Sequence, residues 1–171
     1  MDELQANLPD GLRGGDVADS PLHEVPVREV MDANPPVLSQ ESSLCAVARV
    51  LCDRGHVWIS ESPDSRQICG VVTDKNIVDL LSPLPERCYT TAVIRPKSLD
   101  HIQVARAHEF MTHPVLSCSP DDTVEDALTI MEERHVRILA VVEGNEMVGE
   151  ISLRRVLERF IILSCPLEEP H

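Results

Sequence analysis

The stretch GVVTDKNIV (residues 70–78) recurs near the other end of the chain as GEISLRRVL (residues 149–157). Each copy begins with Gly, places a hydroxyl side chain at its fourth position and then changes to a helix-forming pattern. The two glycines, Gly70 and Gly149, are 79 positions apart (149 − 70). A nonapeptide that returns at such a distance indicates a duplicated structural unit.

Further residues repeat in the same order ahead of each nonapeptide. The PVLS of residues 36–39 aligns with the PVLS of residues 114–117 at an offset of 78. The apolar positions of residues 44–51 then match those of residues 124–131 at an offset of 80. Small shifts at loops with a steady period are typical of a duplication with insertions, so we conclude that the chain contains two copies.

The hydrophobic pattern predicts the same element order in both copies, namely strand, helix, strand, strand, helix. Short first strands are predicted at residues 37–39 and 115–117. In the second copy, Asp122 and Glu125 are expected to form a capping box at the start of the first helix. Residues 143–146 predict a tight hairpin turn. This order is typical of an α+β fold. The last helix of each copy is predicted over residues 76–81 and 154–163.

The composition excludes several classes of partner. The chain has 171 residues and a formal net charge of −14, which disfavours broad nucleic-acid binding and binding to anionic membranes. A small anionic ligand remains possible where cations gather. Of the 15 basic residues, 13 are Arg, the side chain that binds phosphate and carboxylate in a bidentate way.

The termini and the cysteines indicate a cytoplasmic protein. The first 15 residues, MDELQANLPDGLRGG, lack the basic and apolar regions of an export signal, and no apolar run reaches the roughly 18 residues of a membrane span. The chain has six cysteines without a CxxC pair. We therefore interpret them as reduced packing residues and expect no structural metal site.

The paired nonapeptides, each preceded by an opening of the type MDANPPV (residues 31–37) or MTHPV (residues 111–115), resemble those of tandem CBS-domain proteins, also called Bateman modules. This resemblance covers residues 25–163. It implies two pseudo-symmetric repeats packed sheet to sheet, clefts between them, frequent homodimers, and an adenosine-containing ligand such as AMP, ADP, ATP or S-adenosylmethionine. The predicted organisation is a tail (1–24), repeat 1 (25–82), a linker (83–104), repeat 2 (105–163) and a C-terminal tail (164–171).

The resemblance also assigns ligand-binding positions. The hydroxyls of Thr73 and Ser152, each between a strand and a helix start, are expected to hold phosphate. Arg137 belongs to a basic set that can grip the same group. The strand residues expected to hold the adenine are Val37, Trp58 and Ile59 in the first copy, and Val115, Ile138 and Leu139 in the second.

Two positions depart from the family pattern. Where the family has an Asp that accepts hydrogen bonds from ribose hydroxyls, this chain has Asn76 and Arg155. Asn76 can still bond a hydroxyl, whereas Arg155 has no acceptor atom. Arg155 either grips a phosphate or pairs with glutamates along a helix. Trp58, the single tryptophan, either stacks on a base or belongs to the core.

These features favour a non-catalytic regulatory module that binds an adenosine-containing ligand and signals to a separate effector protein. An interaction scaffold without a ligand is the alternative, because the Asp is missing from both copies. An enzyme is the third class. The sequence contains no HExxH, GxSxG or P-loop motif, so we predict no catalytic residues and no required cofactor.

Overall fold

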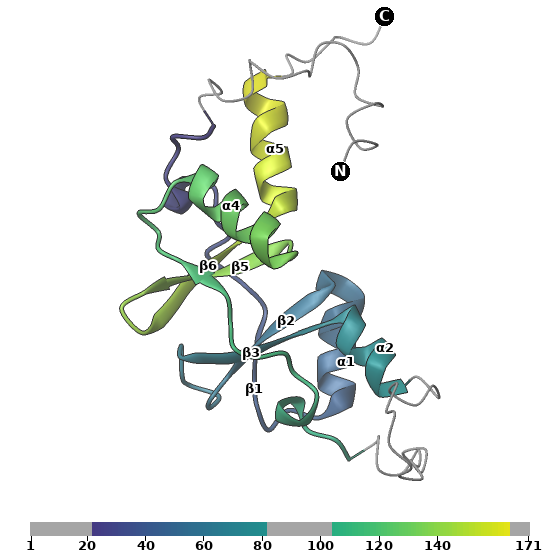
Figure 1. The fold of residues 1–171 in the computed structure, drawn as a ribbon. Coiled ribbons are helices and arrows are strands. Elements are labelled where there is room, and N and C mark those ends of the chain that lie inside the picture. Colours follow the sequence, from purple (N-terminus) through teal and green to yellow (C-terminus); the bar gives the residue numbers. More distant parts are fainter. Residues whose placement is uncertain (1–21, 82–103, 165–171) are drawn as a thin grey trace, which may run out of the picture.

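The computed structural model describes residues 22–81 and 104–164, which form two halves with one three-stranded sheet each (Figure 1). The half that we call repeat 1 contains β1 (Val37–Ser39), α1 (Leu44–Arg54), β2 (His56–Ser60), β3 (Ile68–Thr73) and α2 (Asp74–Leu81). The half that we call repeat 2 contains β4 (Ser117–Cys118), α4 (Val124–Arg134), β5 (Ile138–Glu143), β6 (Glu146–Ser152) and α5 (Leu153–Ser164). Two short 3-10 helices lie ahead of the first strands, η2 (Val27–Glu29) before β1 and η3 (Ala107–Glu109) before β4. The predicted element order is confirmed in both copies.

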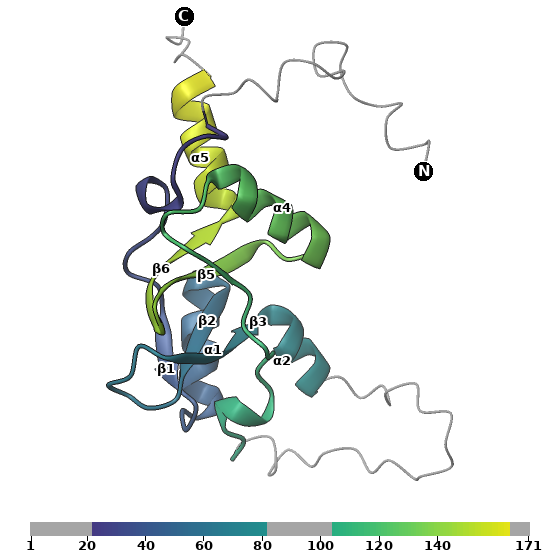
Figure 2. The same cartoon turned by 60° about the vertical axis from the view of Figure 1, so that its left-hand side comes forward.

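The two sheets have the same topology and pack against each other. The middle strand, β2 or β5, runs parallel to the first strand of its repeat and antiparallel to the third. Helices α1 and α2 cover the outer face of one sheet, and α4 and α5 cover that of the other (Figures 1 and 2). The inner faces meet at a seam where Trp58, Ala140 and Met147 are buried together. The α+β, sheet-to-sheet prediction is therefore confirmed.

Strand β2 shows how the sequence builds this layered arrangement. Val57 and Ile59 point to the helix side and belong to the core of repeat 1. Trp58, between them, points to the seam. Because side chains alternate along a strand, a strand with apolar residues at every position can be buried on both faces.

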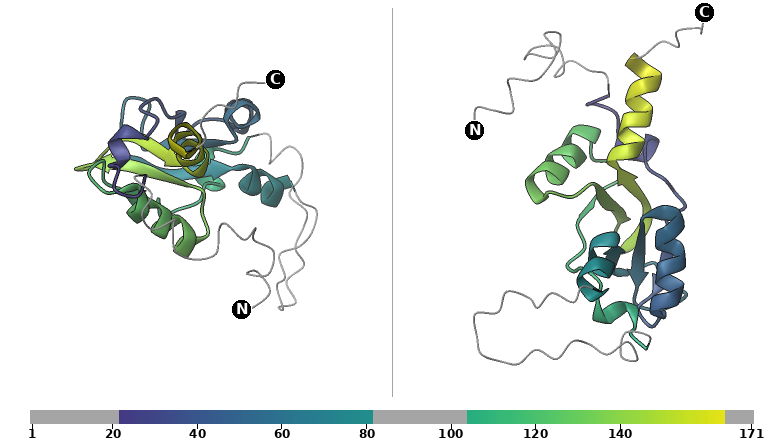
Figure 3. Two further views of the ribbon diagram at one scale, coloured as in Figure 1. Left: turned by 90° about the horizontal axis from the view of Figure 1, so that it is seen from above. Right: turned by 90° about the vertical axis from the view of Figure 1, so that its right-hand side faces the viewer.

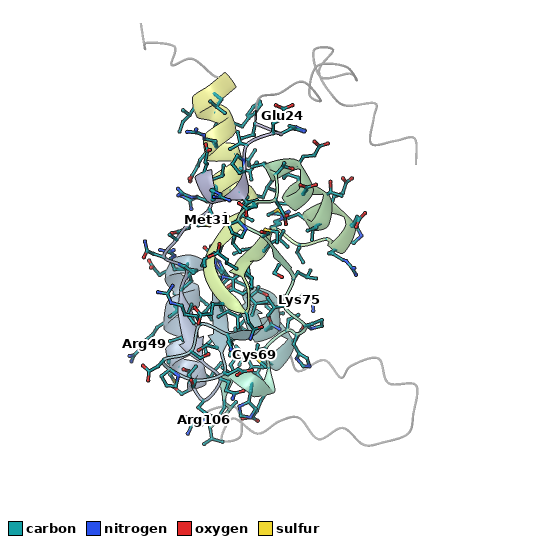
Figure 4. The ribbon with its side chains drawn as sticks, turned by 90° about the vertical axis from the view of Figure 1, so that its left-hand side faces the viewer. Glu24, Met31, Arg49, Cys69, Lys75 and Arg106 are labelled. Carbon is teal, nitrogen blue, oxygen red and sulfur yellow. The ribbon has the colours of Figure 1, made fainter. Side chains whose placement is uncertain are left out.

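The opening segment of each repeat packs on the other repeat. Leu22, Val27 and Val30 lie ahead of β1 in the chain but belong to the core of repeat 2. Ala107, which lies ahead of β4 in the chain, is fully buried in the core of repeat 1. Figure 4 shows the same exchange through Met31, which lies beside repeat 2. Each core is thus completed by residues that lie ahead of the first strand of the other repeat.

This exchange explains why both nonapeptides begin with glycine. Isolated bridges pair Asp32 with Glu150 and Thr112 with Val71, which brings each opening segment against the nonapeptide of the other repeat. A Cβ on Gly149 would lie 2.8 Å from the Asp32 carbonyl oxygen, closer than van der Waals contact permits. A Cβ on Gly70 would collide with the side chain of Met111. Only glycine leaves room for the opening segments.

The first strand of repeat 2 corrects the PVLS alignment. The strand predicted at residues 115–117 is β4, Ser117–Cys118. Ser117 pairs with Ala140, as Val37 pairs with Trp58. Ala140 lies opposite Glu150 and Trp58 opposite Val71, the second residues of the two nonapeptides. The counterpart of Val37 is therefore Ser117 and not Val115, and the offset remains 80 despite the identical letters.

The cap of α4 is also shifted by one residue from the prediction. Thr123, not Asp122, is the N-cap, and its hydroxyl accepts a hydrogen bond from the backbone N–H of Asp126. The Asp126 carboxylate accepts from the backbone N–H of Thr123 in return. Asp122 instead accepts from the backbone N–H of Ser119 in the preceding turn. A carboxylate and a hydroxyl in adjacent positions are both good caps, and the tertiary position of the turn selects between them.

The described cysteines fit the packing interpretation only in part. All four are free thiols. Cys118 is buried, and burial raises its pKa to about 12, while Cys69 is half-buried. Cys45 and Cys52 are exposed on α1, so the prediction was wrong for them. The other two cysteines and the predicted tails and linker, apart from a few end residues, lie outside the described residues.

A membrane-spanning helix is absent from the part of the chain that the structure describes. Within residues 22–81 and 104–164, each helix is too short or too polar to cross a bilayer.

Candidate functional site

A cleft of about 900 Å³ lies at the seam, between the C-terminal ends of the two nonapeptide strands. Both repeats contribute to its wall, because the pseudo-symmetric packing brings β3 and β6, and the starts of α2 and α5, to the same side of the molecule. The volume lies within the range of small-molecule sites in proteins. Its wall is formed by Arg54, Gly55, His56, Trp58, Val71, Thr73, Lys75, Thr112, Pro114, Leu116, His135, Val136, Arg137, Ile138, Ser152, Leu153, Arg154, Leu157, Glu158 and Ile161.

The charge of this wall is opposite to that of the protein. The lining residues include four Arg or Lys side chains, two His and a single carboxylate. The chain as a whole carries −14. A low-dielectric cleft concentrates the field of its lining charges, so this region attracts small anions although the protein repels large polyanions.

In repeat 1, Asn76 ties the hydroxyl at the strand end into the fold. Its side-chain oxygen accepts hydrogen bonds from the Thr73 backbone N–H (2.9 Å) and from the Thr73 hydroxyl (3.0 Å). Its amide nitrogen donates to the hydroxyl of Thr112, in the opening segment of repeat 2 (2.8 Å). Asn76 therefore caps α2 and links it to the other repeat.

In repeat 2, the equivalent hydroxyl is less constrained. The Ser152 hydroxyl accepts a hydrogen bond from the Arg155 backbone N–H at 3.3 Å. The Arg155 side chain turns to Glu158, which also accepts from Arg154 at 3.0 Å. The hydrogen bond from Arg154, and then that from Arg155, lower the pKa of Glu158. In this structure Arg154 and Arg155 therefore both pair with a glutamate along the helix, which is the second of the two interpretations of Arg155.

A buried carboxylate joins the two repeats behind the cleft. Glu150 of β6 is 5% exposed and accepts hydrogen bonds from Trp58 Nε1 (2.6 Å) and from His56 Nε2 (2.8 Å). His56 and Trp58 both belong to β2 of the other repeat. Their rings meet edge to face at 6.2 Å between centroids. A buried carboxylate needs such donors, because desolvation without them would be costly.

The comparison with protein families agrees with this geometry. Residues 107–162, which include nearly all of repeat 2, match the model of the CBS domain. Repeat 1 has the same topology and register. Residues 107–162 are a CBS domain, and repeat 1 has the fold of a second one.

Solved structures of CBS-domain proteins have the same fold. The AcuB protein of Vibrio cholerae superposes with a TM-score of 0.66 at 19% identity, covering 81% of this chain and 92% of its own. CBSX2 in complex with AMP gives 0.64 at 18% identity, covering 80% and 96%. The CBS-domain pair of protein MJ0100, in complex with 5′-methylthioadenosine and S-adenosylmethionine, gives 0.62 at 16% identity, covering 80% and 95%.

Two curated proteins are similar in sequence. An uncharacterized 33.4 kDa protein from a ribosomal RNA operon of Thermofilum pendens is 25% identical over 75% of this chain. A homoserine O-acetyltransferase of Methanosphaerula palustris is 27% identical over 74% of this chain. The chain spans only 37% of the first protein and 22% of the second. The similarity is therefore confined to one part of longer proteins.

The structure brings five of the predicted site residues of the CBS pair to the cleft. These are Trp58, Thr73, Arg137, Ile138 and Ser152. The Trp58 indole is 1% exposed, so in this structure it is a core residue that reaches the wall only at its edge.

The other six predicted residues lie outside the wall of the cleft. Ile59 and Leu139 are fully buried in the helix-side cores, because each follows a seam residue in its strand. Val37 lines a second pocket of about 410 Å³, and Val115 packs at the seam. Asn76 and Arg155 lie at the helix starts and turn to the partners described above.

Sequence reasoning missed the role of Glu150. The sequence signal was a charged residue within an apolar strand: Glu150 is the second residue of its nonapeptide, and the same position in the other copy is the apolar Val71.

No group of three or more metal-binding side chains occurs among residues 22–81 and 104–164. The arrangement suits reversible binding of an anion with an apolar part.

Proposed function

We propose that this CBS pair is a non-catalytic sensor that binds an adenosine-containing ligand in the seam cleft and passes its occupancy to a partner protein. The observation that carries the proposal is the cationic lining of the cleft in a strongly acidic chain. The similarity to folds solved with AMP, or with S-adenosylmethionine and 5′-methylthioadenosine, supports adenosine as the common part of the ligand.

The cleft matches both parts of such a ligand. Ile138, Pro114 and Leu116 provide an apolar wall on the side of repeat 2 for a base. Thr73 and Ser152 place hydroxyls at the helix starts, where a phosphate or carboxylate is favoured. The single carboxylate of the described wall, Glu158, is bonded to Arg154 and Arg155, which supports binding and not general-base catalysis.

Thermal unfolding with a ligand panel tests the proposal. We expect AMP, ADP, ATP or S-adenosylmethionine to raise the melting temperature in proportion to the logarithm of its concentration. Inorganic phosphate and adenine, which each carry one part of a nucleotide, serve as controls for binding of that part alone. No shift with the whole panel, together with nucleotide turnover, would replace the sensor by an enzyme. No shift and no turnover would favour the scaffold.

The ligand-free scaffold is the second candidate because the side chain of Asn76 already forms hydrogen bonds within the protein. Its oxygen accepts twice from Thr73 and its nitrogen donates to Thr112, so ribose recognition would have to compete with these bonds. Asn76→Ala separates the two functions. A sensor that reads ribose at this position loses affinity for AMP, whereas a scaffold shows no binding before or after the change.

We also propose that the effector contact includes a second copy of this chain. Helix α5 extends beyond the rest of repeat 2 (Figure 3) and exposes large apolar side chains along its last turns. On α5 these are Phe160, Ile162 and Leu163, together with Leu157 and Ile161, which also line the cleft. An exposed apolar patch of this kind is typical of a protein–protein contact surface.

Sedimentation of the full chain tests this contact. We expect a dimer at micromolar concentration and a monomer for Ile162→Lys, because Ile162 is 71% exposed and its replacement leaves the core intact. Arg49→Glu on exposed α1 is the matched control and leaves the dimer unchanged. A wild-type chain that remains monomeric at 100-fold higher concentration would exclude the homodimer.

A further inference from the structure

The two ends of the cleft differ in how many of their cations are already neutralised. At the repeat 1 end, Arg54 pairs with Asp32 at 3.2 Å and Lys75 pairs with Asp79 at 2.6 Å. His56 is bonded to the buried Glu150. Every basic side chain on this side of the wall thus has a carboxylate partner. The charge that it offers to a ligand is reduced accordingly.

The repeat 2 end retains uncommitted basic groups. Arg137 and His135 line the cleft and, within the described residues, make no ion pair or side-chain hydrogen bond. Arg154 is the basic residue of this end that has a partner, Glu158. The two ends of the cleft share a backbone plan, but the arginine of the described wall that has no carboxylate partner, Arg137, lies at the repeat 2 end.

His135 occupies this wall in an unfavourable backbone conformation. Its φ of +54° is the single positive φ of a non-glycine residue in the described ranges. It ends α4 as Gly55, with φ of +74°, ends α1. Glycine adopts the left-handed region without a Cβ penalty, so His135 costs stability that a glycine would avoid. Strained residues concentrate at ligand sites, and this one lines the cleft.

The hydroxyls of Thr73 and Ser152 also differ: the one at the repeat 1 end is already engaged as a donor, and the one at the repeat 2 end is not. The Thr73 hydroxyl donates its proton to Asn76. The Ser152 hydroxyl accepts from the Arg155 backbone N–H, and the described residues offer its proton no acceptor. A phosphate oxygen can take a hydrogen bond from Ser152 without breaking an existing one. It would have to displace Asn76 to take one from Thr73.

We infer that the cleft binds one anionic ligand per chain, with its phosphate at the repeat 2 end, held by Arg137, Ser152 and His135. This inference rests on the proposed function, and it adds an orientation, a stoichiometry and a role for His135. An imidazole N–H can donate to a phosphate oxygen in the neutral and the protonated form. The base then lies against the apolar wall of Pro114, Leu116 and Ile138.

Calorimetry of the full chain with AMP tests the orientation. We expect one site per chain. Arg137→Ala should weaken AMP binding about 10- to 100-fold, as the loss of a charge-assisted hydrogen bond does. The matched variant is Arg54→Ala at the other end, which should change the affinity by less than about 3-fold because Asp32 already pairs with this side chain. Two equivalent sites, or a larger loss for Arg54→Ala, would overturn the inference.

The role of His135 is tested by two substitutions that tolerate a positive φ. His135→Gly should raise the melting temperature by about 2–4 °C and weaken AMP binding several-fold. His135→Asn should keep the backbone conformation and also lose affinity. If His135 only ends the helix, both variants bind AMP like the wild type, and that result would remove His135 from the site.

A third arm separates this inference from the proposed function. Adenosine lacks the phosphate, so Arg137→Ala and His135→Gly should bind adenosine as the wild type does. A wild-type chain that binds neither AMP nor adenosine overturns both the proposed function and the inference. A wild-type chain that binds AMP, with Arg137→Ala binding equally well, overturns the inference alone.

Discussion

The two repeats meet at the seam with different side chains on the same backbone positions. Trp58 of repeat 1 occupies the place that Ala140 has in repeat 2. Val71 of β3 occupies the place of Glu150 in β6. The large Trp58 thus packs with the small Ala140 at the seam. The single carboxylate, Glu150, accepts hydrogen bonds from donors of the other repeat. Identical residues on both sides would bring like groups together near the pseudo-twofold axis, where two carboxylates or two indoles would compete for one space.

The opening segments give the strongest test of how far the repeats depend on each other. Val27, ahead of β1, is fully buried in the core of repeat 2, and Ala107, ahead of β4, is fully buried in the core of repeat 1. Val27→Asp and Ala107→Asp should each lower the free energy of unfolding by about 4 kcal/mol or more, because each buries a carboxylate without a partner. Urea unfolding followed by circular dichroism measures the loss.

The control for both variants is Arg49→Asp on the exposed surface of α1, which should change the stability by less than about 0.5 kcal/mol. If Val27→Asp behaves like this control, the opening segment does not complete the core of repeat 2. Loss of a single repeat in a two-step transition would show that the repeats unfold separately.

The buried carboxylate gives the next largest expected effect. Glu150→Val introduces the residue type found at the equivalent position of repeat 1, and it leaves the buried Trp58 Nε1–H without an acceptor. We expect a loss of about 3 kcal/mol of unfolding free energy. Adding Trp58→Phe removes the orphaned donor and should recover about 1 kcal/mol, a coupling that a double-mutant cycle measures. Strict additivity of the two changes would contradict the observed hydrogen bond.

The two nonapeptide glycines should respond unequally to the same substitution. In Gly149→Ala the new methyl group meets the Asp32 carbonyl oxygen, which belongs to the backbone and is fixed by a bridge. In Gly70→Ala it meets the flexible side chain of Met111. We expect a loss of about 2 kcal/mol for Gly149→Ala and about 1 kcal/mol for Gly70→Ala, measured by thermal unfolding. Equal losses would mean that Met111 cannot move.

The smallest expected effect distinguishes the two helix starts. Thr123 caps α4 in a reciprocal box with Asp126, whereas Ser43 caps α1 by accepting one hydrogen bond, from the backbone N–H of Ala46. Thr123→Ala should cost about 1 kcal/mol, and Ser43→Ala about half as much. Chemical unfolding at neutral pH compares the two variants.

The capping box also has a pH signature. Hydrogen bonds from the Thr123 hydroxyl and backbone N–H lower the pKa of Asp126 below its ordinary value of 3.8. A lowered pKa means that the contribution of this carboxylate is present above pH 3.8 and is lost as the pH falls through the lowered value. Thr123→Ala removes the hydroxyl donor but keeps the backbone N–H donor, so it should weaken this part of the acid dependence. An unchanged acid limb would show that Asp126 keeps other donors.

The element order and the duplication could be predicted because they depend on local patterns. Gly70 and Gly149, the hairpin at residues 143–146 and the helical periodicity of residues 44–51 are legible without knowledge of the fold. The site residues were predicted less well. Ile59 and Leu139 fit an apolar wall by type, but strand alternation directs them to the helix side and gives the seam to Trp58 and Ala140.

Register errors have a similar origin. The letters PVLS occur in both copies, yet Val37 corresponds to Ser117, because pairing with β5 and not sequence identity sets the strand position. Thr123 and Asp122 are equally suitable caps in isolation, and the turn that precedes α4 selects one of them. Choices between neighbouring residues of equal propensity are decided by tertiary contacts.

The sequence alone determined that this chain is a doubled α+β unit with a negative body and clustered arginines, since repetition, periodicity and charge are properties of the linear order. The tertiary structure decided which residues face the cleft, which arginines are neutralised, and that each opening segment completes the other repeat. These outcomes depend on which side chains become neighbours across the seam. Residues far apart in sequence, such as His56 and Glu150, acquire that relation only when two sheets pack together.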